Sequence, residues 1–169
     1  MGKLVRNFYK LLMGLSCMAM LAAFGTVMLG VLAREAKWDI PGLDAYAGYA
    51  IAAALFLALP GTLQHGDHIR VTLLLDRVSP RVRSVLEWWS LAAGLALTAY
   101  VAWYAARLVW VSYITHDVSP AADASPLWIP QLAMALGCIG FALSFVHALV
   151  ERWYGGSFIA VSSEAAHIE

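Results

Sequence analysis

The sequence predicts an all-α membrane protein with four transmembrane helices and a short amphipathic interfacial helix between spans two and three. Composition is the first observation: 62% of the residues are hydrophobic and 13% are charged, whereas about a quarter of the residues in a soluble domain are charged. The second is a set of four long apolar stretches, and the third is a polar–apolar mixture between the middle two. The formal net charge is zero, so nothing favours a nucleic-acid partner.

The predicted four-span membrane domain covers residues 1–150, with spans at about 11–33, 45–63, 88–113 and 127–150, and residues 151–169 form a cytoplasmic tail. The first run has 23 residues, which exceeds the apolar region of a secretory signal, about 7–15 residues. As a helix it reaches about 34 Å, enough to cross a bilayer. We therefore expect it to be a retained membrane span. Pro60, near the end of the second span, predicts a kink or an early helix end.

The stretch 67–78 is too short to span a bilayer. Four of its apolar residues share one face at helical spacing, and they are Val71, Leu74, Leu75 and Val78. Such a pattern is typical of an amphipathic helix that lies in the plane of the membrane interface. Ser79 and Pro80 are the residue types of an N-cap and a first helical position, so a new helix is expected to start there and to lead into the third span.

Topology follows from the basic residues. Eight of the eleven Lys and Arg residues fall on one side of the predicted spans, and they are Lys3, Arg6, Lys10, Arg70, Arg77, Arg81, Arg83 and Arg152. On the other side are Arg34, Lys37 and Arg107. Because basic residues accumulate in cytoplasmic loops, both termini and the central polar stretch are predicted to be cytoplasmic.

Small residues recur at about every fourth position in each span: Ala22, Thr26 and Gly30; Ala50, Ala54 and Ala58; Gly94, Thr98, Ala102 and Ala106; Gly140, Ser144 and Ala148. Small residues allow helix backbones to approach closely in lipid. The stripes favour packing within the bundle, and the alternative is that some of them face another membrane subunit. The candidate interface or lipid-facing positions are Trp38, Leu74, Val78, Trp88, Trp89, Ala102, Arg107 and Gly140.

Charge inside the spans, the usual mark of a transport pathway, is nearly absent. Arg107 is the one candidate, and it lies close enough to the outer interface for its side chain to reach water. The sequence shows neither an obvious internal repeat nor the broken helices that coordinate sodium in transporters. The chain is therefore a poor candidate for moving a polar solute by itself.

Residues for catalysis or cofactor binding are sparse. Cys17 and Cys138 lie in apolar runs without a Cys-x-x-Cys pair, so neither a disulfide nor a zinc site is predicted. We find no nucleophile–base set and no phosphate-binding glycine loop, and we expect neither enzymatic activity nor a cofactor. One rival interpretation is a haem-bearing electron-transfer subunit, with His147 and either His65 or His68 as ligands between helices. A second rival is a small assembly or regulatory membrane protein.

The hexapeptide Gly-Asp-His-Ile-Arg-Val, residues 66–71, resembles a motif of the small membrane subunit (DctQ-like) of tripartite ATP-independent periplasmic (TRAP) transporters. The family pattern is Gly-x-His-Ile-x-Val-Asp after the second of four spans, and its matching residues here are Gly66, His68, Ile69 and Val71. Further matches are Arg34, Trp38, Asp44, Pro126, Trp128, Leu136 and Gly137. Thr72 departs from the pattern, which has Asp at that position.

The resemblance implies a non-catalytic subunit of a sodium-coupled transporter that imports an organic acid across the bacterial inner membrane. Its implied partners are a large TRAP membrane subunit, a periplasmic substrate-binding protein and membrane lipids. In that family the large subunit is expected to carry the substrate and sodium sites and to move as an elevator. The small subunit would then stabilise and anchor the fixed scaffold.

Overall fold

The computed structural model describes residues 3–65, 79–121 and 124–154. Within these ranges the helices are α1 (Lys3–Glu35), α2 (Leu43–His65), α4 (Pro80–Thr115) and α5 (Trp128–Trp153). All four are long and apolar enough to cross a membrane, which confirms the all-helical fold class. The predicted interfacial helix at 67–78 lies outside the described residues and remains a prediction.

Helix ends agree with the local sequence signals. Helix α4 begins at Pro80, directly after Ser79 in extended backbone (φ −62°, ψ 153°), as the serine–proline pair predicts. It ends at His116, a left-handed residue (φ 56°, ψ 40°) whose amide donates to the Ser112 carbonyl. Helix α2 continues through Pro60 to His65, so the helix does not end at its proline.

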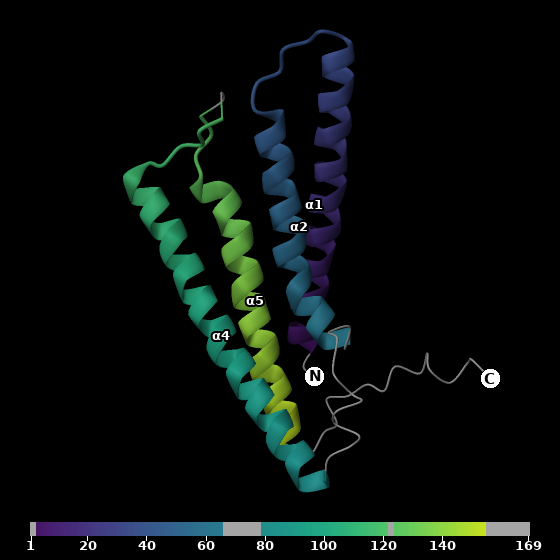
Figure 1. Ribbon diagram of the computed structural model, residues 1–169, viewed down its shortest axis with the longest axis vertical. Coiled ribbons are helices and arrows are strands. Elements are labelled where there is room, and N and C mark those ends of the chain that lie inside the picture. Colours follow the sequence, from purple (N-terminus) through teal and green to yellow (C-terminus); the bar gives the residue numbers. More distant parts are fainter. Residues whose placement is uncertain (1–2, 66–78, 122–123, 155–169) are drawn as a thin grey trace, which may run out of the picture.

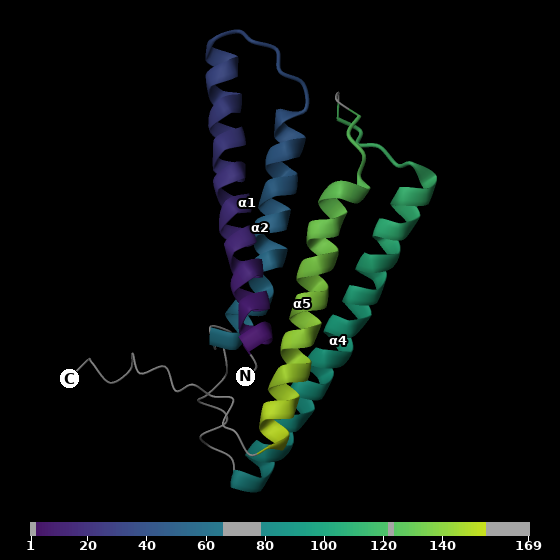
Figure 2. The same cartoon turned by 180° about the vertical axis from the view of Figure 1, so that it is seen from behind.

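The four described helices form one layer in the order α1, α2, α5, α4 (Figures 1 and 2). Helices α2 and α5 meet in the middle, while α1 packs on α2 and α4 packs on α5. We call the end with Lys3 and Trp153 the termini end, and the end with the connections 36–42 and 116–127 the loop end. The two outer helices diverge toward the loop end (Figure 1). At the termini end α1 also reaches α5, where the Tyr9 and His147 rings stack with 6.5 Å between centroids.

The α2–α5 crossing is built around Pro60. Proline has no amide hydrogen, so the Phe56 carbonyl one turn earlier loses its usual helical donor. Gly137 of α5 lies against that carbonyl, and a Cβ built on Gly137 would overlap the Phe56 oxygen. A Cβ on Gly140 would come within 2.9 Å of Pro60 Cγ and 2.7 Å of Leu12 Cδ1. Because the two glycines have no side chains, α5 can pack directly against the turn of α2 in which proline removes a backbone hydrogen bond.

Two buried serines tie the neighbouring helices to α2. Ser16 Oγ of α1 donates to the Ala54 carbonyl at 2.7 Å. Ser144 Oγ of α5 lies 3.3 Å from the Pro60 carbonyl and 3.1 Å from that of Gly140. Such interhelical hydrogen bonds contribute on average about 0.6 kcal/mol each in membranes. The hydrogen bonds fix how the helices are oriented relative to one another, whereas close packing supplies most of the stabilisation.

The α4–α5 contact uses small residues in the same way. Ala102 and Ala105 of α4 form a buried cluster with Ala135 and Cys138 of α5. A Cβ on Gly94 would come within 2.8 Å of Phe145 Cζ, so the phenyl ring occupies the space that glycine leaves. Alanine and glycine on one helix thus accommodate larger side chains on the other, as ridge-into-groove packing requires.

Replacing Gly137 by alanine should destabilise the chain, because the added methyl group overlaps the Phe56 backbone and forces the helices apart. Overpacking of this kind costs about 1–3 kcal/mol. Gly25→Ala is the matched control, since a Cβ there meets nothing within 4 Å. The measurement is thermal unfolding in detergent of a Cys17→Ser background, followed by a thiol-reactive dye that reports exposure of the buried Cys138. Equal midpoints for the two alanine variants would contradict the assigned contact.

Candidate functional site

Charged side chains gather at the two ends of the layer. At the termini end, Glu87 of α4 pairs with Arg83 Nε at 3.2 Å and with Arg152 Nη2 of α5 at 2.8 Å. Arg152 also lies 3.3 Å from Ser84 Oγ. These contacts connect the start of α4 to the end of α5. Because the carboxylate is partly buried, water and salt screen these ion pairs less than they screen an exposed pair.

Aromatic side chains accompany that cluster. Trp88 is half-buried and meets Trp153 edge to face, with 6.0 Å between ring centroids, while Trp89 is 70% exposed. Tryptophan is enriched where the apolar core of a bilayer meets the headgroups. Their placement agrees with a membrane boundary near the first turns of α4.

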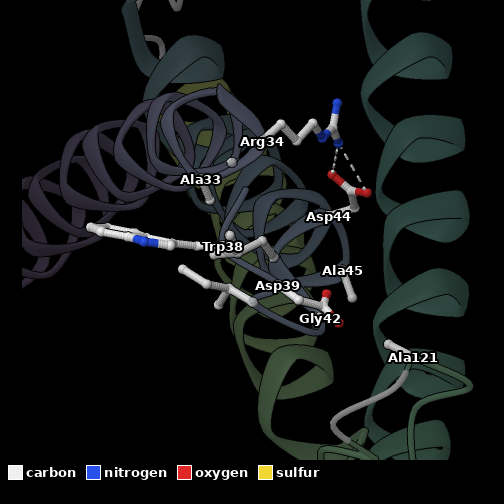
Figure 3. Close-up of a pocket in the computed structure, with 11 residues that line it drawn as sticks. Ala33, Arg34, Trp38, Asp39, Gly42, Asp44, Ala45 and Ala121 are labelled. Atoms are coloured by element: carbon white, nitrogen blue, oxygen red, sulfur yellow. Dashed lines mark hydrogen bonds and ion pairs between the residues drawn. The ribbon is translucent and has the colours of Figure 1, made fainter. Parts of the chain in front are cut away.

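The loop end holds a cavity of about 360 Å³. Its polar lining comes from the end of α1 and the start of α2, where Arg34 and Asp44 form an exposed ion pair at 3.1 Å. Trp38 and Asp39 come from the connection between them, and Ala121 comes from the other loop (Figure 3). The Tyr49 hydroxyl donates to Ser119 Oγ at 2.7 Å, which joins α2 to that second loop. The second loop, which contributes Ala121 to the cavity, is thus fixed to α2.

No cluster of metal-ligating side chains occurs in the parts of the chain that the structure describes. His147, one of the residues considered for haem, stacks on Tyr9, and its Nε2 lies 3.7 Å from Glu151 Oε1. The His65 side chain and His68 lie outside the described residues. No observation favours the haem interpretation.

The largest feature of the described surface is apolar. In the most apolar windows of α1 and α4 only 11% of the residues are buried, against 33% for α2 and α5. On α1 the exposed side chains include Met18, Leu21 and Phe24, and on α4 they include Leu97, Trp103 and Trp110. The described helices of this layer enclose no central passage. Because the exposed surface is apolar, it is suited to contact with lipid or with another membrane protein.

The structure separates the candidate positions into three groups. Ala102 is buried against α5, and Gly140 is buried where α5 meets α1 and α2. The second group is at least partly exposed: Trp38, Trp89 and Arg107 are exposed, and Trp88 is half-buried. The family-motif residues and two candidate positions lie outside the described residues: Gly66, His68, Ile69, Val71, Leu74 and Val78.

Sequence analysis missed the most constrained contacts. Ser16 and Gly137 were not singled out for the contacts they make, although both lie in the buried seams. The sequence does carry a signal for the contact between α2 and α5. It is Pro60 in one span together with Gly137 and Gly140, three residues apart, in another. In α1 the buried face includes Leu12, Ser16 and Ala23, whereas Ala22 of the predicted stripe is exposed, because one residue corresponds to 100° of rotation on a helix.

The comparison with known families agrees with this architecture. The family model described as "Tripartite ATP-independent periplasmic transporters, DctQ component" matches residues 23–155, about four-fifths of the chain. No curated protein and no solved structure matches the chain. The matched region begins within α1 and includes α2, α4 and α5. The chain belongs to the DctQ family, the small membrane component of TRAP transporters.

Proposed function

We propose that this chain is the non-catalytic small membrane subunit of a sodium-coupled TRAP transporter that imports an organic acid. Its role is to stabilise and anchor the fixed scaffold of the large transport subunit. The observation that carries the proposal is the single layer, whose outer helices leave most of their apolar side chains without partners from the described part of the chain. The family and the four apolar helices indicate a multi-pass inner-membrane protein.

Helix α1 offers a specific surface for the large subunit. Gly14, Met18, Leu21 and Gly25 follow one another at helical spacing on the side away from α2. A Cβ at either glycine would meet nothing within 4 Å, so a partner helix has room to approach the α1 backbone closely. Because lipid gives helices no hydrophobic reason to associate, such close approach is what drives contact. We assign this α1 face to the partner.

In the proposed orientation the two ends of the layer face opposite sides of the membrane. With both termini in the cytoplasm, the arginines near Glu87 lie at the cytoplasmic interface, as the positive-inside rule expects. The loop end, with Trp38 and its cavity, then faces the periplasm, where a substrate-binding protein would arrive. Substrate and sodium sites belong to the large subunit in this proposal, because the contacts described above between α2 and α5 come from phenylalanine, proline, glycine and serine rather than from ionisable side chains.

The transport role predicts that the chain is inactive alone and required in the complex. Proteoliposomes would contain the chain, the large subunit or both, with a sodium gradient and the cognate binding protein outside. Uptake of labelled organic acid is expected only when both membrane subunits are present. Uptake by the small chain alone would refute the proposal, and undiminished uptake without it would remove its supporting role.

Orientation is tested by single cysteines in a background lacking Cys17 and Cys138. An impermeant thiol reagent added to intact spheroplasts should label a cysteine at Lys37 and leave one at Arg81 unmodified. Labelling of both should follow when the membrane is made permeable. Labelling at Arg81 before permeabilisation would show that the assigned topology is inverted.

If this face of α1 binds the large subunit, a substitution on it should impair assembly of the complex without impairing folding of the chain. Gly25→Leu should not lower the melting temperature of the isolated chain, because it adds a side chain to open space and leucine favours the helix more than glycine does. It should lower the yield of complex with the large subunit several-fold by blocking close helix contact. Val85→Leu is the matched control on α4, at a position that is already 67% exposed. Unchanged complex yield with Gly25→Leu would mean that another face of the layer docks.

A further inference from the structure

Arg107 lies on the edge of the layer that α4 forms. It follows Thr98, which is buried against α5, by about two and a half turns at 3.6 residues per turn. Its side chain is exposed and starts from the side of α4 opposite to α5. Within residues 3–65, 79–121 and 124–154, the structure gives it no hydrogen bond or ion pair.

Three other arginines near an end of the layer have carboxylate partners. Arg34 pairs with Asp44 across the loop-end cavity, and Arg83 and Arg152 share Glu87. Arg107 therefore differs from them in having an exposed guanidinium with its hydrogen-bonding capacity free among the described groups. A guanidinium carries five N–H donors in a fixed fork that fits the oxygens of a carboxylate or a phosphate.

Large aromatic side chains flank Arg107 on the same side of α4. Trp103 precedes it by one turn and Trp110 follows it by one turn, and they are 71% and 66% exposed. Tryptophan and tyrosine are enriched at the level of the headgroups, where one end of the ring is apolar and the other meets polar groups. The environment of Arg107 is thus that of a membrane interface.

The depth of Arg107 agrees with that environment. The Trp88–Trp89 pair marks the interface at the termini end of α4, and Arg107 lies about 28 Å further along the helix at 1.5 Å per residue. The hydrocarbon core of a bilayer is about 30 Å thick. Arg107 therefore falls at the inner edge of the headgroups of the opposite leaflet, within reach of their phosphates.

We propose that Arg107 binds the headgroup phosphate of a phospholipid in the leaflet at the loop end. The guanidinium donates to two phosphate oxygens, while Trp103 and Trp110 pack along the glycerol and the first methylenes of the acyl chains. Charge complementarity and depth select this occupant, because every phospholipid presents an anionic phosphate at this level. The contact fixes the height of α4 in the bilayer and does not depend on the proposed docking to a large subunit.

The test titrates lipid into the delipidated full-length chain in detergent, with bound lipid counted by native mass spectrometry. The probes are dioleoylphosphatidylglycerol and, as a ligand without phosphate, dioleoylglycerol. Arg107→Gln should weaken phosphatidylglycerol binding at least three-fold and leave dioleoylglycerol binding unchanged. Arg107→Lys should give intermediate binding, since lysine keeps the charge and loses the fork. Arg34→Gln is the matched control and should bind phosphatidylglycerol as the wild type does.

Glutamine forms helices nearly as well as arginine, so the exposed substitution keeps α4 intact, which circular dichroism checks. Equal phosphatidylglycerol binding by wild type and Arg107→Gln overturns the proposal. So does an equal loss with Arg34→Gln, which would reflect total charge alone, or a parallel loss of dioleoylglycerol binding, which would not involve the phosphate. Unchanged lipid binding combined with weaker capture of the large subunit would instead assign Arg107 to a carboxylate of a protein partner.

Discussion

The contact between the Phe56 carbonyl and Gly137 is the constraint on which the arrangement of the helices depends. Pro60 removes the donor that this carbonyl would use within α2, and only a residue without a Cβ lets α5 approach it so closely. Ser144 then bonds the Pro60 carbonyl from the same face of α5. The α2–α5 pair is thereby fixed in register, and α1 and α4 are added on its two flanks.

An open layer of helices exposes more apolar surface than a closed bundle does. Each flank helix buries one narrow stripe and presents the rest of its apolar surface to the surroundings. Proteins of the DctQ family work in complexes with a large membrane subunit, and our proposal is that part of this apolar surface contacts that subunit. Polar groups occupy the ends of the layer, where Glu87 and its arginines join α4 to α5 and the Tyr49–Ser119 hydrogen bond joins α2 to a loop.

Much of this architecture could be predicted from the sequence, because the free energy of transfer into lipid depends on composition and length. The four helices follow from hydropathy, and the start of α4 follows from Ser79 and Pro80. The order of the helices could not be predicted, since apolar side chains that face lipid look the same in sequence as those that face a helix. The buried face of α1 shows this: Ala22 and Ala23 have the same chemistry, and only Ala23 is buried. The motif from Gly66 to Val71 identified the family, yet it lies outside the described residues.

The central claim, that the chain forms an open layer with α1 and α4 at opposite edges, is tested most directly by one distance. Spin labels on cysteines replacing Leu32 of α1 and Tyr113 of α4, both exposed at the loop end, would be measured by double electron–electron resonance in lipid nanodiscs. Helices pack about 8–10 Å apart, so three steps across a layer predict a separation of about 25 Å or more. A distance below about 15 Å, as in a closed four-helix bundle, would contradict the account.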